Sequence, residues 1–254
     1  MSQPPEVNVH YELMQFGKKM STVCIISILS VIFSEILEII NIIVLFSALK
    51  NMERIYGAIP DISLKKFKSN IRTAIRIQIL GFITLIGVVI AISIFMTIAF
   101  SNGSGNINIK DLSFIINISF SIAIIACIVI VLASVFMMSG WSDLNTFFIN
   151  HGDVFEGVLR DDVQKGSKYL RRAYLLEILT YIMMIIILVL FINFIPEIIL
   201  LDSESEISPE IFIPLMIVVA VPGTGLIITW LTSFTFKILG YYKLASLRYI
   251  KAQS

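Results

Sequence analysis

Five long apolar runs constrain the fold of this chain more than any other feature of its sequence. They cover residues 21–49, 73–100, 112–139, 173–201 and 210–237. Each run exceeds the roughly 20 residues that a helix needs to cross a bilayer. Charged residues make up only 15% of the chain, against about 25% in ordinary soluble domains. The sequence therefore predicts an all-α fold, a polytopic membrane helix bundle of about five transmembrane helices in a single membrane domain (1–254).

The segments outside these runs are short. We expect residues 1–20 to form an N-terminal tail, 140–172 a cytoplasmic loop and 238–254 a cytoplasmic tail in the membrane interface. The first run contains no Gly or Pro between Thr22 and Lys50. Because nothing in it breaks a helix, we expect one long helix there. The alternative is a first run that is re-entrant or lies in the interface.

Lysine and arginine are distributed unevenly among the loops, and short loops rich in positive charge stay in the cytoplasm. Sixteen of these residues follow the first, third or fifth run, whereas Lys18, Lys19 and Lys110 lie on the other side. We therefore expect a multi-pass protein of the cell membrane with its N-terminus outside and its C-terminus in the cytoplasm. Lys18 and Lys19, directly before the first run, favour the opposite orientation by themselves.

The second and third runs align with the fourth and fifth at a shift of about 99 residues. The aligned pairs include Ile71 with Leu170, Ala74 with Ala173, Gly140 with Gly240, Trp141 with Tyr241 and Leu144 with Leu244. Asp61 and Asp162 precede the two halves and could each cap a helix. A duplicated helical hairpin and convergent chemistry at helix ends both explain this alignment. On either interpretation, the apolar residues after the third and fifth runs suit helices along the cytoplasmic membrane surface.

Polar residues inside the first run form the main candidate site. They are Ser27, Ser30, Ser34, Glu38 and Asn41, spaced by three and four, with Glu35 beside them. This spacing places them along one face of a helix. Because carboxylates inside a membrane are costly and usually functional, the set Glu35, Glu38, Ser34 and Asn41 could line a hydrated path for a proton or a cation. The alternative is interhelical hydrogen bonding with both glutamates neutral.

The fifth run contains a second candidate site, the sequence Pro222-Gly223-Thr224-Gly225. Proline removes the backbone hydrogen bond to residue 218. Broken helices in transporters hold ions and substrates with such freed carbonyls. We therefore expect a helix break that involves Val218, Pro222, Gly223, Thr224 and Gly225. The alternative is a simple kink that improves packing.

Enzymatic signatures are absent from the sequence. His10 and His151 lie outside the apolar runs, and no H-E-x-x-H, G-x-S-x-G or Walker sequence occurs. Cys24 and Cys127 have no spacing partner that predicts a metal site. We expect no catalytic residue, metal, cofactor or nucleic-acid partner. The expected partners are the lipid bilayer and either a second copy of the chain or other membrane subunits.

These features favour a non-enzymatic transport element or a subunit of a membrane complex. The Ile-rich runs with basic boundaries loosely resemble small prokaryotic membrane proteins. A structural, assembly or lipid-binding membrane scaffold is the second hypothesis, because the basic loops offer an edge for a protein or for anionic lipid. A lipid-modifying enzyme is the third, without a visible catalytic set.

Overall fold

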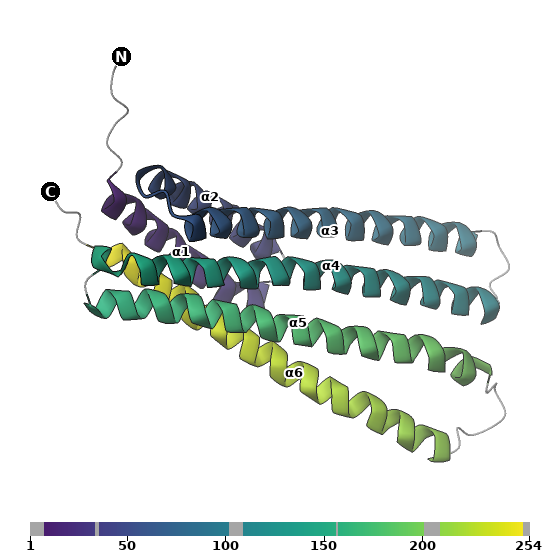
Figure 1. Cartoon of the computed structure of the whole chain (residues 1–254). Helices are drawn as coiled ribbons and strands as arrows, with labels where there is room; N and C mark the ends of the chain where they lie inside the picture. Colours follow the sequence, from purple (N-terminus) through teal and green to yellow (C-terminus); the bar gives the residue numbers. More distant parts are fainter. Residues whose placement is uncertain (1–7, 34–35, 102–108, 156, 201–208, 251–254) are drawn as a thin grey trace. The chain divides into compact units, whose positions relative to one another are not determined.

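The computed structural model describes residues 8–33, 36–101, 109–155, 157–200 and 209–250, and among them it contains helices joined by short turns and no strand (Figure 1). The α-helices are α1 (Val9–Phe33), α2 (Ile36–Ala58), α3 (Ile62–Ser101), α4 (Ile109–Asn150), α5 (Gly157–Leu200) and α6 (Pro209–Ala245). Short 3-10 helices, η1 (Gly152–Val154) and η2 (Ser246–Tyr249), follow α4 and α6. The all-α prediction is confirmed for the described residues.

Two helical segments among the described residues are long and apolar enough to cross a membrane. They are Asn117–Asn150 in α4 and Leu159–Asn193 in α5. Only 22% and 6% of their apolar windows are buried, whereas the core helix of a soluble protein is mostly buried. This finding rests on length and composition, and the prediction of five spans is not confirmed.

The chain divides into two compact units, and helices α3 to α6 contribute to both. The first comprises Met1–Arg76, Ala133–Leu176 and Leu231–Ser254, and the second comprises Ile77–Leu132 and Glu177–Trp230. Of the 19 lysines and arginines, 18 belong to the first and only Lys110 to the second. We call the first the basic unit and the second the apolar unit. The apolar runs alone predict one domain and do not indicate this division.

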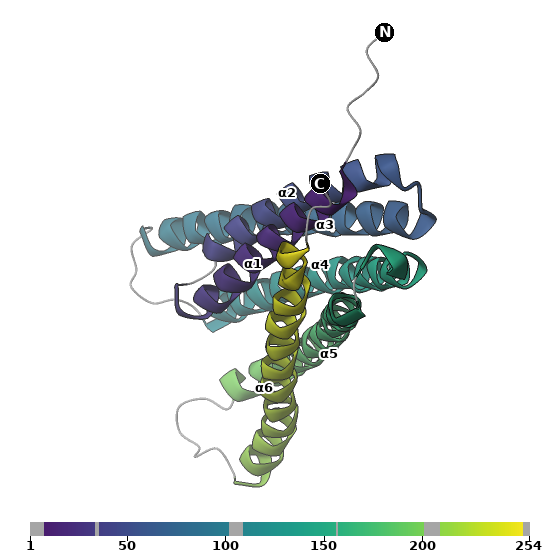
Figure 2. The ribbon, with the colours of Figure 1, turned by 90° about the vertical axis from the view of Figure 1, so that its left-hand side faces the viewer.

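Helices α1 and α2 form an antiparallel hairpin, so the prediction of one helix over residues 21–49 is wrong. Figure 2 shows the two helices side by side. Asn41 Nδ2 donates a hydrogen bond to Ser27 Oγ at 2.7 Å, and Lys19 Nζ donates to the Ser47 carbonyl oxygen at 2.8 Å. Because the partner's number rises as the α1 number falls, the helices run in opposite directions. The prediction failed because a helix can end without Gly or Pro. Contacts between α1 and α2, which are distant in sequence, stabilise the hairpin instead.

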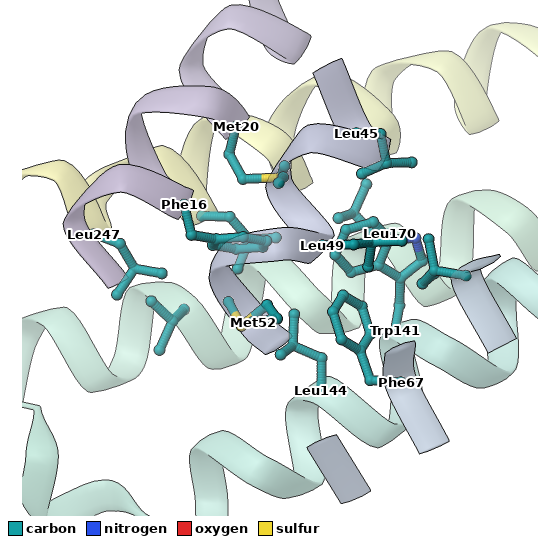
Figure 3. Close-up of a cluster of buried hydrophobic side chains, with 14 of the residues drawn as sticks. Phe16, Met20, Leu45, Leu49, Met52, Phe67, Trp141, Leu144, Leu170 and Leu247 are labelled. Atoms are coloured by element: carbon teal, nitrogen blue, oxygen red, sulfur yellow. The ribbon is translucent and has the colours of Figure 1, made fainter. Parts of the chain in front are cut away.

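The basic unit has a hydrophobic core to which all six helices contribute. Figure 3 shows part of it, with the labelled side chains Phe16, Met20, Leu45, Leu49, Met52, Phe67, Trp141, Leu144, Leu170 and Leu247. Trp141 is fully buried. Its ring centroid lies 5.5 Å from that of Phe67 and 6.1 Å from that of Tyr241. Aromatic side chains of this size make the largest single contributions to a core.

The three segments predicted as an N-terminal tail, a cytoplasmic loop and an interfacial tail contain helices that pack into this core. Helix α1 begins within the predicted tail 1–20 and buries Phe16. Residues 140–172 include the end of α4 and the start of α5, and residues 238–254 include the end of α6 and η2. Leu144 and Leu244 are fully buried. The sequence pattern identifies the apolar face of each helix end, but protein covers that face rather than the membrane surface.

The apolar unit exposes much of its apolar surface. Thr180 Oγ1 donates a hydrogen bond to Thr229 Oγ1 at 2.9 Å, and the rings of Phe120 and Phe191 stack with centroids 6.0 Å apart. Large exposed apolar side chains of this unit include Ile79, Leu80, Ile83, Ile90, Ile125, Leu132, Ile186, Ile227 and Ile228. Large apolar surfaces of this kind mark contact with a membrane or with another protein.

Equivalent positions of the internal repeat make equivalent contacts in the basic unit. A Cβ atom added at Gly140 would lie 2.7 Å from Ile71 Cδ1, and one added at Gly240 would lie 2.5 Å from Leu170 Cγ. Helix α4 therefore packs on α3 through the aligned positions at which α6 packs on α5. A duplicated hairpin and convergent helix ends both remain compatible with this correspondence.

Candidate functional site

A cavity of about 340 Å³ lies between α4 and α5 in the basic unit. Its lining residues are Ser142 and Asn145 from α4, and Ser167, Lys168, Arg171, Arg172 and Leu175 from α5. Residues three and four apart share a face of a helix. Lys168, Arg171 and Arg172 therefore project from one face of α5, opposite the Ser142 and Asn145 face of α4.

The cavity is strongly positive. Among the described residues, no carboxylate lines it, and Lys168, Arg171 and Arg172 form no ion pair. All three residues are exposed. Like charges at this helical spacing repel one another. A bound anion would remove that repulsion, and arginine offers two parallel donors to a phosphate or a carboxylate.

Neutral groups complete the lining. The Ser167 hydroxyl donates to the Val163 carbonyl oxygen at 2.8 Å, so its proton is already used. Asn145 Oδ1 is buried, and the described residues offer it no hydrogen-bond partner. The Asn145 amide nitrogen and the Ser142 hydroxyl are then the neutral donors available to the cavity. Leu175 adds an apolar wall. The arrangement suits a ligand with an anionic part and an apolar part.

The polar stripe predicted in the first run is divided between the two hairpin helices. Ser34 and Glu35 lie outside the described residues, and Glu38 belongs to α2 but its side chain is not described. Asn41 bonds to Ser27, and Asn41 Oδ1 is buried with no partner among the described residues. The bond between Asn41 and Ser27 fits the interpretation of interhelical hydrogen bonding. No described contact connects these residues to a hydrated path.

The second candidate site does not interrupt its helix. Helix α6 is continuous over Pro209–Ala245, so the helix is not interrupted at Val218, Pro222, Gly223, Thr224 and Gly225, and binding by these residues stays a prediction. Thr224 Oγ1 donates to the Ala220 carbonyl oxygen at 2.8 Å. The side chain of Val218 lies outside the described part of the chain.

A buried polar network inside the hairpin was not predicted from the sequence. Glu12 is 5% exposed; it accepts hydrogen bonds from Asn51 Nδ2 at 2.6 Å and from Arg54 Nη1 at 3.0 Å. Lys19 Nζ donates to Asn51 Oδ1 at 2.6 Å. Burial lowers the pKa of Lys19 below its ordinary value, and the nearby Glu12 opposes this shift. Because these groups satisfy one another, the network holds the hairpin together.

Asp61 caps a helix, as the repeat predicts, but Asp162 does not. Asp61 Oδ1 accepts hydrogen bonds from the backbone N–H groups of Ser63 at 2.6 Å and Leu64 at 3.0 Å. Asp162 lies inside α5 and accepts a bond from Lys243 Nζ at 2.8 Å. Burial alone would raise the pKa of Asp61. These backbone hydrogen bonds and one with His151 outweigh burial, so the pKa lies below its ordinary value.

Asp61→Ala is expected to lower the free energy of unfolding by about 1 kcal/mol near neutral pH, because it removes the cap of α3. The pKa of Asp61 is lowered in the folded protein, so its ionic contribution is complete above the ordinary pKa of about 3.9. That contribution is lost as the pH falls through the folded-state value. Denaturant unfolding in mild detergent at several pH values measures the difference, which should narrow in acid. A difference that widens in acid would contradict this assignment.

Comparison with protein families, with curated proteins and with solved structures finds no match. Within the part of the chain that the structure describes, no group of three or more His, Cys, Asp or Glu residues is placed to hold a metal ion. The positive cavity is the described arrangement with the most defined binding chemistry. The sequence shows that its basic residues share a helix face, but it does not show which residues of α4 lie opposite them.

Proposed function

We propose that this protein is a non-enzymatic, multi-pass membrane protein whose basic unit lies against the anionic cytoplasmic leaflet and binds lipid as a scaffold. The division of charge carries this proposal. The basic unit has 18 basic and 11 acidic residues, and the apolar unit has 1 and 7. Positive charge gathered on one side of apolar spans is typical of the cytoplasmic side, and anionic lipid attracts it.

The hairpin supports four spans, in α3 to α6, in place of five. From Met20 to Phe33, α1 extends about 21 Å, short of the roughly 30 Å hydrocarbon core. Helix α1 also packs on η2 at the other end of the chain, where Arg248 Nη1 donates to Ser21 Oγ at 2.9 Å. The two termini then share one side. Lys18 and Lys19 then lie in the cytoplasm with the other basic residues. These two lysines conflict with an N-terminus outside the cell, and they agree with four spans.

The transport hypothesis keeps its own test. Glu35 and the side chain of Glu38 lie outside the described part of the chain, and α6 is a continuous helix. Flux of protons or cations through reconstituted protein, compared with Glu38→Gln, remains its test. A flux that Glu38→Gln abolishes would return this hypothesis to first place.

Cysteine labelling tests the proposed topology. Single cysteines are introduced at Ser2, Ser203 and Ser254 in a Cys24→Ala, Cys127→Ala background, and intact cells are treated with an impermeant thiol reagent. Ser203→Cys, between α5 and α6, is expected to react in intact cells. Ser2→Cys and Ser254→Cys are expected to react only after permeabilisation. Labelling of Ser2→Cys but not of Ser254→Cys in intact cells would restore the N-outside, C-inside orientation and rule out four spans.

A further inference from the structure

We infer that the cavity between α4 and α5 is a specific site for one phosphate group, carried by an anionic lipid headgroup. The inference deepens the proposed function and rests on it for the lipid source. The phosphate site itself stands on the lining of the cavity. Lys168, Arg171 and Arg172 line it, form no ion pair with any described residue, and share the lining with no described carboxylate.

The donor set matches a tetrahedral, multi-oxygen anion. Two arginines can each approach phosphate oxygens with parallel N–H groups, and a lysine adds a point charge. Asn145 and Ser142, on the facing helix, add neutral donors for a remaining oxygen or a headgroup hydroxyl. Cavities of roughly 300–1,000 Å³ hold small ligands, and the observed 340 Å³ is enough for a phosphate with a short polar headgroup.

The order of the lining residues along α5 favours a lipid over a free anion. The cations occupy positions 168, 171 and 172, and Leu175, 48% exposed, follows them. The apolar run 173–201 continues from there along the same helix. A ligand whose phosphate meets the cations can therefore extend its apolar part along α5. Inorganic phosphate would use the charged half of this site alone.

Ligand titration of the full-length protein, delipidated in a neutral detergent, tests the inference. The probes are short-chain phosphatidylglycerol, short-chain phosphatidylcholine and inorganic phosphate. We expect saturable binding of phosphatidylglycerol with one molecule per chain, at least tenfold tighter than binding of the other two probes. Equal affinity for inorganic phosphate would overturn the lipid source. Absence of saturable binding of any phosphate probe would overturn the site.

Two charge-matched triple variants separate a site from diffuse attraction. The first is Lys168→Gln with Arg171→Gln and Arg172→Gln, and the second is Lys50→Gln with Lys65→Gln and Lys66→Gln, which are exposed residues of α2 and α3 in the basic unit. We expect the first to weaken phosphatidylglycerol binding at least tenfold and the second less than twofold. Equal losses would overturn the site in favour of diffuse charge. All six positions are exposed, and an unchanged unfolding midpoint verifies each fold.

Failure of the phosphate site and failure of the proposed function give different results. If cysteine labelling places the basic unit outside the cell, the cytoplasmic assignment fails, whereas the titration still reports on the cavity. If labelling supports the topology but both triple variants bind alike, the cavity assignment fails alone.

Discussion

Trp141→Ala is expected to lower the free energy of unfolding by about 3–5 kcal/mol, the range for truncating a large aromatic residue in a packed core. Trp141 is fully buried, and its ring contacts those of Phe67 and Tyr241. Alanine would leave a cavity that neighbours from α3 and α6 cannot fill without moving. Denaturant unfolding of the protein in mild detergent, followed by helical circular dichroism, measures the loss.

Trp141→Phe is the matched control. The indole Nε1 of Trp141 has no hydrogen-bond partner among the described residues, so phenylalanine removes volume without breaking a described bond. We expect less than half of the loss caused by alanine. If the two variants destabilise the protein equally, the ring contacts contribute little and the core is not packed around this side chain.

The apolar spacing at the helix ends identifies the helix face that is buried, but it does not predict that protein covers this face. Leu144 and Leu244 follow their apolar runs at equivalent positions, and both are fully buried. A helical period identifies one apolar face. It does not say whether lipid, water interface or another helix lies against that face. The basic unit therefore cannot be predicted without the contacts between segments that are distant in sequence.

The hairpin of α1 and α2 also could not be predicted from local sequence patterns. Its defining bonds join Glu12 to Asn51 and Lys19 to Ser47, pairs separated by 39 and 28 residues. Local sequence contains no signal for such pairs, and the absence of Gly or Pro is compatible with a helix end. The basic residues Lys168, Arg171 and Arg172 are likewise readable as one helix face. The cavity exists only because α4 lies opposite that face.

The internal repeat is the sequence feature that the structure supports most. In the apolar unit, a Cβ atom added at Gly81 would lie 2.5 Å from Val129 Cγ1, and Thr180 bonds to Thr229. These two contacts are related by a shift of about 99 residues. The contacts of the basic unit follow the same shift. Both sets of contacts follow the alignment, and duplication of a hairpin stays a prediction.

Gly17→Ala is expected to destabilise the protein by about 1–3 kcal/mol, the range for overpacking a tight contact. A Cβ atom at Gly17 would lie 2.4 Å from the backbone nitrogen of Arg248 and 2.7 Å from the backbone carbon of Leu247. Because these atoms belong to backbone, η2 must move away from α1. Leu247 would then leave the core, and Arg248 would lose its bond to Ser21. Unfolding and tryptic cleavage after Arg248 both measure this release.

Gly57→Ala is the matched control, because Gly57 is helical and exposed and has nothing within 4 Å of an added Cβ atom. Alanine is favoured over glycine in a helix by roughly 0.5–1 kcal/mol. The same substitution should therefore stabilise the protein slightly at position 57 and destabilise it at position 17. If Gly17→Ala stabilises as well, α1 and η2 are not in close contact. The proposal that both termini lie on one side of the membrane would then lose its most direct support.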